Sequence, residues 1–299
     1  MDLIRENNKV DKDYQLITAR YKLSTVEQKL VLSIISLIRP TDSDFMNYQI
    51  PLSQFEFLAD NCNGTRLKKY CKDLMSKPLE VPTEDGWKIF NWFSHIEYSK
   101  KSNMLECSIS HKLKPYLLEL KENFKSYNLK YILPMQSEYS IRIYEILKKA
   151  EKLGYLEIDV EELQLILDVP ESFKIYNRFK EKVLQPTSIE IAKFSDIYFE
   201  FKELKTGKKV TKIKFIIKRN IQNIMAEEDY EFKKFRELII NDYEGYPVIY
   251  HPQIERHIMI KDGLLVVEES GTIIKSEKAL DLWIFIYKNK DKILTKPMF

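Results

Sequence analysis

Two neighbouring stretches decide how this chain folds: YLEIDVEELQLILDV, from Tyr155 to Val169, and FKIYNRFKEKVL, from Phe173 to Leu184. The first opens as a short alternating strand and continues with apolar residues at helical spacing, which predicts a strand followed by an amphipathic helix. The second also has helical periodicity and is rich in cations. Pro186 follows it and predicts that this helix ends before the proline. A helix, a short break and a second, basic helix is the order of a helix-turn-helix.

The same order occurs earlier in the chain. There, YQIPLSQFEFLAD, from Tyr48 to Asp60, precedes the basic stretch TRLKKYCKDLM, from Thr65 to Met75. Each copy continues as strand, turn and strand, and FSHIEY, from Phe93 to Tyr98, closely matches FSDIYF, from Phe194 to Phe199. A hairpin that follows a helix-turn-helix in both copies predicts two wings.

A helix is also expected before each copy. Leu23 to Ile38 contains a capping box, in which the side chains of Ser24 and Glu27 satisfy each other's backbone amides, and Ser137 to Ala150 precedes the second copy. The chain is therefore predicted to be α+β, with two tandem winged helix-turn-helix domains in a pseudo-two-fold relation. The predicted boundaries are 1–130 and 131–222.

The tail is predicted to form a small C-terminal α+β module over residues 228–299. Tyr230 to Ile240 has the pattern of a helix, and Ser276 to Tyr287 has that of another, with Leu280, Trp283, Ile284 and Tyr287 on one face. Between them, Asp262-Gly263 separates two apolar runs and is a strong signal for a two-residue hairpin.

Composition narrows the class of protein. The chain has 299 residues, 44% of them apolar and 31% charged, which is enough for two folded domains. No apolar run is long enough to cross a bilayer, and the N-terminus lacks the apolar segment of a signal peptide. The three cysteines (Cys62, Cys71 and Cys107) form no CxxC pair, so we expect reduced thiols in a cytoplasmic protein without membrane association.

The charge is unevenly distributed along the chain. The net charge is only +3, yet Pro170 to Gln222 holds 13 Lys or Arg against 6 Asp or Glu, and Ala226 to Phe299 holds 11 against 14. A basic segment beside an acidic tail predicts a polyanion-binding surface on one part of the molecule.

Motifs for catalysis or cofactor binding are absent from the sequence. It contains neither GxxxxGK[ST] nor GxGxxG, and the four histidines (His95, His111, His251 and His257) have no metal-ligand spacing. No acid/base pair stands out, and Tyr144, in the helix before the second copy, is expected in the core. These observations predict a protein that is not an enzyme and that has no metal and no cofactor.

The basic helix of the second copy is expected to be capped by Ser172 and to turn its apolar residues inward: Ile175, Tyr176, Phe179 and Val183. Its outward side chains would be Lys174, Asn177, Arg178, Glu181 and Lys182. Arg pairs bidentately with guanine and Asn with adenine, so Arg178 and Asn177 are the predicted base readers. Lys174 and Lys182 suit phosphates. The wing adds four lysines for the DNA backbone: Lys205, Lys208, Lys209 and Lys212.

The first copy has a weaker form of the same pattern. Its candidate DNA-binding residues are Arg66, Lys68, Lys69 and Lys72 on the helix and Lys100 and Lys101 in the wing. Asp73 dilutes this charge, and the alternative that these lysines form only a solvated face remains open. Winged helices also dimerise through such surfaces.

Taken together, these segments resemble the replication initiator proteins of iteron-bearing bacterial plasmids. The resemblance covers roughly Lys9 to Asn220 and includes SEYSIRIYEILKK, from Ser137 to Lys149, the helix-turn-helix from Val160 to Ile191, and TGKKVTKIKF in the last wing. That wing has Gly207-Lys208 where the family often has Gly-Arg, which keeps the charge but loses the planar fork of arginine.

The resemblance implies that the protein binds direct repeats at a plasmid origin as a monomer, melts adjacent A+T-rich DNA, and recruits the host initiator and helicase. It also implies a homodimer, formed through the first winged domain, that represses the protein's own gene. Two other readings remain: a winged-helix transcription repressor without initiator activity, and a strand-nicking replication enzyme. For the C-terminal module, a protein-docking role and a role in covering the second winged domain both stay open.

Overall fold

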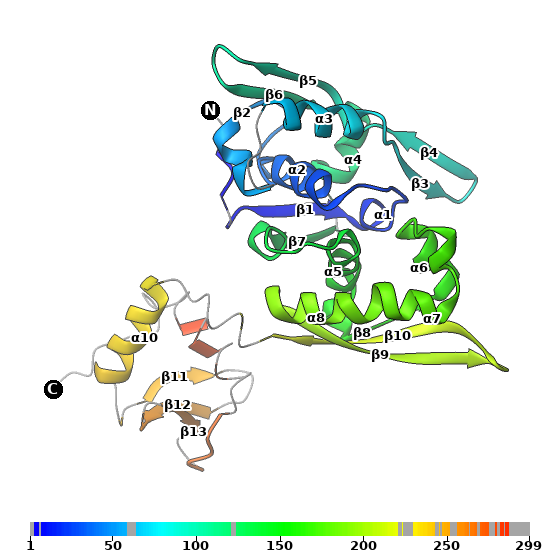
Figure 1. Cartoon of the computed structure of the whole chain (residues 1–299). Helices are drawn as coiled ribbons and strands as arrows, with labels where there is room; N and C mark the ends of the chain where they lie inside the picture. Colours follow the sequence, from blue (N-terminus) through cyan, green and yellow to red (C-terminus); the bar gives the residue numbers. More distant parts are fainter. Residues whose placement is uncertain are drawn as a thin grey trace. The chain divides into compact units, whose positions relative to one another are not determined.

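A computed structural model describes residues 3–5, 7–58, 64–120, 124–220, 223, 230–242, 245, 247–251, 256–262, 264–267, 270–274, 279, 282–283 and 285–286. The chain forms two compact units, Met1–Asn220 and Ile221–Phe299, which are described separately (Figure 1). The first unit holds both predicted helix-turn-helix copies.

The first copy is a winged helix, as predicted. Its elements are α2 (Thr25–Ile35), β2 (Asn47–Pro51), the 3₁₀ helix η1 (Leu52–Leu58), α3 (Gly64–Met75), β5 (Phe93–Ser99) and β6 (Met104–Ile109). The three strands form an antiparallel sheet in the order β2-β6-β5. The predicted capping box is present, because Ser24 accepts a hydrogen bond from the Glu27 amide while the Glu27 carboxylate accepts one from the Ser24 amide.

Several elements of the first copy have no counterpart in the sequence prediction. They are β1 (Lys9–Asp13), α1 (Tyr14–Ile17), β3 (Leu79–Thr83), β4 (Gly86–Phe90), α4 (Lys114–Leu117) and β7 (Phe124–Asn128). β3 and β4 form a hairpin, and β1 pairs antiparallel with β7. The β1–β7 pair joins segments more than a hundred residues apart, so a pattern within a short stretch of sequence cannot predict it.

The second copy is also a winged helix. Its elements are α5 (Glu138–Ala150), β8 (Tyr155–Asp159), α6 (Val160–Ile166), α7 (Tyr176–Phe179), the π-helical turn η6 (Lys180–Leu184), α8 (Gln185–Phe194), β9 (Ile197–Thr206) and β10 (Lys209–Arg219). The sheet order is β8-β10-β9, and both strand pairs are antiparallel.

The basic helix of this copy corrects two predictions. α7, η6 and α8 follow one another without a break, so Pro186 lies inside a long helix rather than beyond its end. The π-helical turn stands immediately before the proline, which lacks an amide hydrogen and cannot complete an ordinary α-helical turn. Phe194 consequently ends this helix instead of starting the next strand, which begins at Ile197.

The second unit is the predicted α+β module. It contains α10 (Tyr230–Asp242) and the antiparallel strands β11 (Pro247–His251), β12 (Arg256–Lys261) and β13 (Leu264–Val267) in the order β11-β12-β13. The predicted hairpin is β12–β13. Trp283 belongs to its apolar cluster, together with Ile239, Ile258 and Ile260, whereas Leu280, Ile284 and Tyr287 lie outside the described residues.

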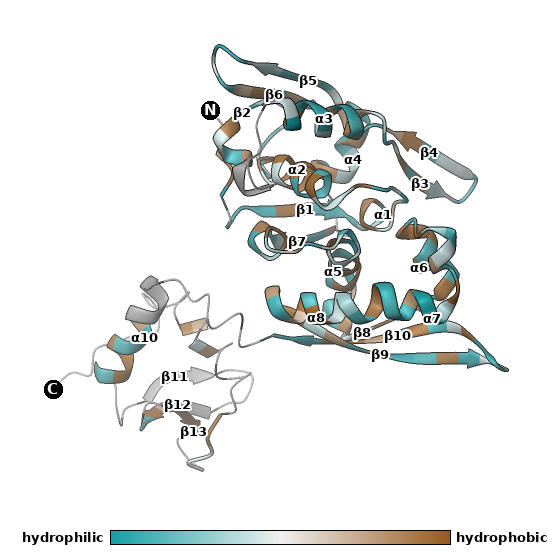
Figure 2. Cartoon of the chain, viewed as in Figure 1, coloured by the Kyte–Doolittle hydropathy of each residue, from teal (hydrophilic) through white to brown (hydrophobic). Residues whose placement is uncertain are grey.

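A single hydrophobic core runs through the first unit. It includes Leu30 and Ile34 of α2, Ile141 and Leu147 of α5, and residues of both three-stranded sheets. Figure 2 shows hydrophobic residues along α2 and α5, in the middle of the unit, and mostly hydrophilic residues along the β9–β10 wing. The two winged domains therefore share one interior.

A buried polar network lies within that interior and joins the two winged domains. Lys12 of β1 and Glu145 of α5 are both fully buried and form an ion pair of 2.8 Å. Arg142 contacts Glu145 at 3.4 Å, donates to the carbonyl oxygen of Ala19 at 2.7 Å and hydrogen-bonds the Tyr21 hydroxyl. Tyr127 donates to Glu145.

This network holds two cations and one carboxylate away from water. Burial lowers the pKa of Lys12 by more than Glu145 raises it. Burial also raises the pKa of Glu145, but Lys12, Arg142 and the hydrogen bonds outweigh this effect, so the pKa of Glu145 lies below its ordinary value. The network fixes the position of α5, and with it that of the second winged domain, against β1.

Candidate nucleic-acid interface

The helix-turn-helix of the second winged domain is held together by local hydrogen bonds. α6 ends at Ile166, and the left-handed backbone of Asp168 (φ 45°), two residues later, allows the Val169 amide to donate to the carbonyl oxygen of Gln164. Nε2 of Gln164 donates to the carbonyl oxygen of Lys174 at 3.0 Å. The turn is therefore anchored to α6 immediately before the basic helix begins.

All four predicted DNA-binding side chains of this helix are exposed: Lys174, Asn177, Arg178 and Lys182. Phe179 and Val183 are buried on the opposite face, as expected. Lys180 pairs with Glu203 of β9 at 2.8 Å and ties the helix to the wing. Among the described residues, the side chains of Arg178 and Asn177 form no hydrogen bond or ion pair within the chain, which leaves their donors available to an external ligand.

The beginning of the helix departs from the prediction. Ser172 lies in a 3₁₀ turn, Glu171–Phe173, and the N-cap of α7 is Ile175. Ile175 is 68% exposed instead of facing inward, whereas Tyr176 is half-buried and packs against the core, as predicted. The helix starts later than the sequence pattern indicated, so Ile175 precedes it and does not follow the inward stripe.

The four predicted DNA-binding lysines of this wing are all exposed, and two of them are paired. Lys209 forms an ion pair with Glu161 at 2.8 Å, and Lys212 lies 3.7 Å from Asp159. No carboxylate of the described chain pairs with Lys205 or Lys208. Exposed ion pairs contribute little to stability, so the paired lysines can exchange their carboxylate for a phosphate.

The predicted DNA-binding residues of the first winged domain form fewer ion pairs with the described chain than those of the second domain. The six candidate side chains of the first domain are all exposed: Arg66, Lys68, Lys69, Lys72, Lys100 and Lys101. Within the described part of the chain, the five lysines form no ion pair. Acidic side chains of the described chain therefore neutralise less of the positive charge of these six residues than of the candidate residues in the second domain. Counting charged residues along the sequence does not predict this difference.

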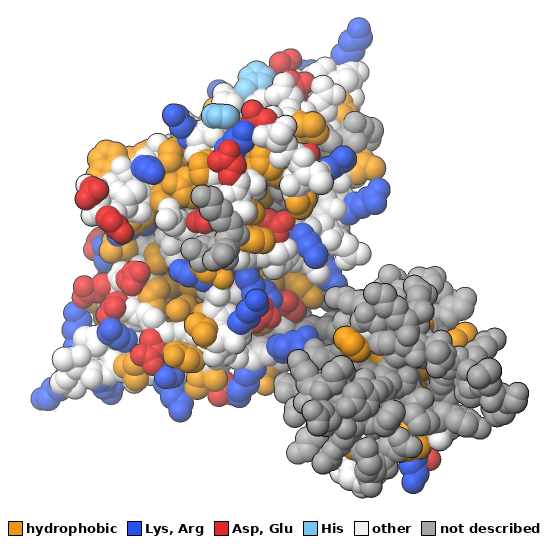
Figure 3. All heavy atoms as spheres, turned by 180° about the vertical axis from the view of Figure 1, so that it is seen from behind, with side chains coloured by type: hydrophobic (Ala, Val, Ile, Leu, Met, Phe, Trp, Pro, Cys, Tyr) orange, Lys and Arg blue, Asp and Glu red, His pale blue; other side chains and the backbone are white. Residues whose placement is uncertain are grey.

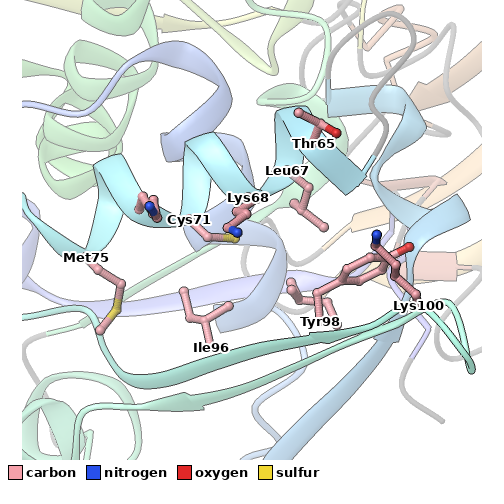
Figure 4. A pocket seen from close by; sticks show the side chains of 10 residues that line it. Thr65, Leu67, Lys68, Cys71, Met75, Ile96, Tyr98 and Lys100 are labelled. Carbon is pink, nitrogen blue, oxygen red and sulfur yellow. The ribbon is translucent and has the colours of Figure 1, made fainter.

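A cleft of about 880 Å³ lies between α3 and the β5–β6 hairpin. Figure 4 shows Leu67, Cys71 and Met75 of α3 facing Ile96 and Tyr98 of β5 across it. Lys68, Lys72 and Lys100 also line the cleft. The predicted phosphate-binding lysines of this domain therefore border a hollow with an apolar floor.

Cationic side chains also project at the ends of the first unit. Viewed from behind, Lys and Arg side chains occur at its two opposite tips, and the face between them mixes apolar, acidic and further basic side chains (Figure 3). The two wings end in turns that carry Lys100 and Lys101 in one case and Lys208 in the other. Each wing therefore carries positive charge at its tip.

Tyr144 is fully buried, as expected, and its hydroxyl donates to Asp196 at 3.0 Å. Burial, followed by the charge of Asp196, raises its pKa well above the ordinary value, so it is a poor candidate for a nucleophile. Within the described ranges, no three His, Cys, Asp or Glu side chains gather in a way that could hold a metal ion. No described helix is long and apolar enough to cross a membrane.

Comparison with known proteins agrees with this geometry. Residues 9–148 match the family model described as "Initiator Replication protein, WH1", and residues 159–217 match "Initiator Rep protein, WH2". A replication initiation protein of Escherichia coli is 29% identical over 204 residues, which cover 63% of this chain and 63% of that relative. A solved structure, the Pi initiator protein in complex with iteron DNA, has a TM-score of 0.57 at 20% identity and covers 71% of this chain and 97% of that one.

The basic helix of each helix-turn-helix, α3 in the first domain and α7 with η6 in the second, is called the reader helix. Two winged helices with such reader helices define a tandem winged-helix DNA-binding protein. The two family models together span two-thirds of the sequence. The chain belongs to the family of initiator replication (Rep) proteins of iteron-bearing plasmids. The C-terminal module lies beyond both matched regions.

Proposed function

We propose that the protein initiates plasmid replication by binding direct repeats at the origin in a sequence-specific manner. The observation that carries this proposal is the exposure of Asn177 and Arg178 at the start of the second reader helix, where their side chains form no hydrogen bond or ion pair with the described chain. In this proposal they read base edges, while the lysines of both helices and both wings contact phosphates. The resemblance of the fold to an initiator solved with iteron DNA supports it.

The two winged domains act together in this proposal. Since they share one core, binding of one domain places the other at high effective concentration over the same DNA, and their affinities multiply. Binding and DNA deformation, rather than hydrolysis, then drive the opening of adjacent A+T-rich DNA. In this proposal the protein acts in the bacterial cytoplasm without a cofactor. It recruits the host initiator and helicase to the opened origin.

Binding and opening can be tested separately. Duplexes selected from random DNA by the full chain should converge on one sequence that is repeated at the plasmid origin. Permanganate should then modify thymines beside those repeats in supercoiled DNA only when protein is present. Selective binding without permanganate reactivity, combined with loss of plasmid maintenance but retained repression, would favour a plain repressor. A covalent protein–DNA adduct in Mg²⁺ would favour a nicking enzyme.

Autoregulation belongs to the same proposal: a homodimer formed through the first winged domain represses the protein's own gene. Sedimentation over a range of protein concentrations should detect monomer and dimer. A reporter fused to the gene's promoter should be repressed in proportion to the dimer. A chain that stays monomeric at concentrations that repress the reporter contradicts this part of the proposal.

The C-terminal module is proposed as a docking site for another replication protein. It folds as a separate compact unit and lies outside the region matched by the family models. Deleting residues 227–299 should leave repeat binding intact and abolish plasmid maintenance. Loss of repeat binding would indicate instead that the module supports the second winged domain.

A further inference from the structure

Ile175 is the N-cap residue of the second reader helix, immediately before its first turn, and its side chain lies in solvent. It is 68% exposed, whereas Phe179, one turn later on the same helix, is fully buried. Its backbone is extended (φ −66°, ψ 124°), and its carbonyl accepts the first helical hydrogen bond, from the Phe179 amide at 2.9 Å. Ile175 therefore stands at the tip of the helix, outside the apolar stripe that packs on the core.

This tip is held firmly. The residue before Ile175 is bound through its carbonyl to Gln164, which is itself buried in α6. At the next turn of the helix, Lys180 is paired with Glu203 of the wing. Ile175 is thus presented from a fixed backbone, so a contact made by its side chain requires little further ordering of the chain.

The residues next to Ile175 indicate which kind of ligand group its side chain contacts. Asn177 and Arg178 are exposed in the same first turn, where a reader helix meets base edges in the major groove. The apolar group that the major groove offers is the C5-methyl of thymine. We propose that Ile175 reads a thymine by packing against its C5-methyl group, next to the base pairs read by Asn177 and Arg178. This inference rests on the proposed DNA-reading function.

The same helix supplies a matched control. Ile189 of α8 is 71% exposed, so it equals Ile175 in residue type and exposure, but it lies at the far end of the helix, beyond the π-helical turn. Exposure alone would give both residues the same effect on binding. Only a contact at the helix tip makes them differ.

The test uses the full chain and the duplex that it selects from random DNA. Each thymine is replaced singly by deoxyuridine, which removes the methyl group and keeps the hydrogen-bonding edge. At one or two positions the wild type should lose about fourfold in affinity, which corresponds to burial of one methyl group. Ile175→Ala should bind the thymine duplex about fourfold more weakly and be indifferent to uracil there. Ile189→Ala should behave like the wild type.

A second pair of bases isolates the methyl group from base identity. At the same position, 5-methylcytosine should bind the wild type about fourfold better than cytosine, and Ile175→Ala should bind both equally. The inference is overturned if no uracil substitution weakens the wild type, or if Ile175→Ala keeps the full uracil penalty. If the chain selects no sequence at all, the proposed function itself fails, and that result is distinct from the other two.

Discussion

Replacing Glu145 by Gln removes the only carboxylate from the buried network between the two winged domains and keeps its shape. Lys12, fully buried 2.8 Å from that carboxylate, then loses its ion-pair partner, and Arg142 loses its neighbouring charge. Breaking a buried ion pair in this way costs about 3–5 kcal/mol of folding free energy. Glu145→Gln leaves two buried cations without an anion, so the upper half of that range is expected.

Lys12→Met should have a much smaller effect, because the network contains one cation more than its carboxylate can neutralise. Without Lys12, Glu145 still has Arg142 at 3.4 Å and the hydroxyl of Tyr127. Removing one partner of a buried ion pair is costly when it leaves the other charge uncompensated, but here Arg142 still neutralises Glu145 and methionine fills the space of the lysine stem, so we expect a loss of less than about 1.5 kcal/mol. The double variant should be more stable than Glu145→Gln alone, since one of the two uncompensated cations is gone.

Urea unfolding of the four proteins, followed by circular dichroism and tryptophan fluorescence, measures this cycle. Trp92 is a suitable reporter because its ring lies edge-on to Tyr21, with centroids 5.0 Å apart. With a denaturant slope of about 2 kcal/mol per molar, Glu145→Gln should lower the midpoint by roughly 2 M and Lys12→Met by well under 1 M. Equal losses of stability for the two single variants, or strictly additive losses in the double variant, would contradict the explanation that the network holds one cation more than its carboxylate can neutralise.

Four further expectations can be checked with standard assays. Arg178→Ala should cost about 1–3 kcal/mol of specific binding and relax selectivity at one base pair, which competition between specific and random duplexes will show. Lys208→Ala should weaken all sequences alike and lower the slope of log affinity against log salt by about 1 in a salt titration. Ser24→Ala should destabilise the chain by about 1 kcal/mol in thermal unfolding, because the capping box is lost. The pKa of Glu145 is depressed in the folded chain, so its contribution is present above its ordinary value of 4.5 and is lost as the pH falls through the folded value; Glu145→Gln should show a flatter acid limb of stability.

Local periodicity was sufficient to predict both winged domains. The capping box at Ser24 and the return strand Met104–Ile109 lie where the sequence indicated, because each depends on spacing within a few residues. The β1–β7 pair and the burial of Lys12 depend on partners more than a hundred residues away. A lysine at the centre of a short polar strand resembles a surface residue until its carboxylate is known.

Part of the candidate interface was predictable in the same sense. The exposed faces of α3 and α7 follow from helical spacing, and every predicted cation on them is indeed exposed. Ile175 was placed inward because the predicted helix began too early, and a shift of the starting residue changes which side chains share a face. The pairing of Lys209 with Glu161 joins a wing to a helix and could not be derived from charge counts.

The π-helical turn at Lys180–Leu184 divides one helix between two tasks. Beyond it, Thr187 and Ile191 are buried, and Thr187 hydrogen-bonds Ser140 of α5 at 3.4 Å, so this half anchors the helix to the interior. Before it, the exposed side chains of the first turn take almost no part in that anchoring. Under the proposed function, substitutions at residues 174–178 would change which DNA sequence is bound while the anchoring half of the helix stays constant, so that specificity can diverge on an unchanged scaffold.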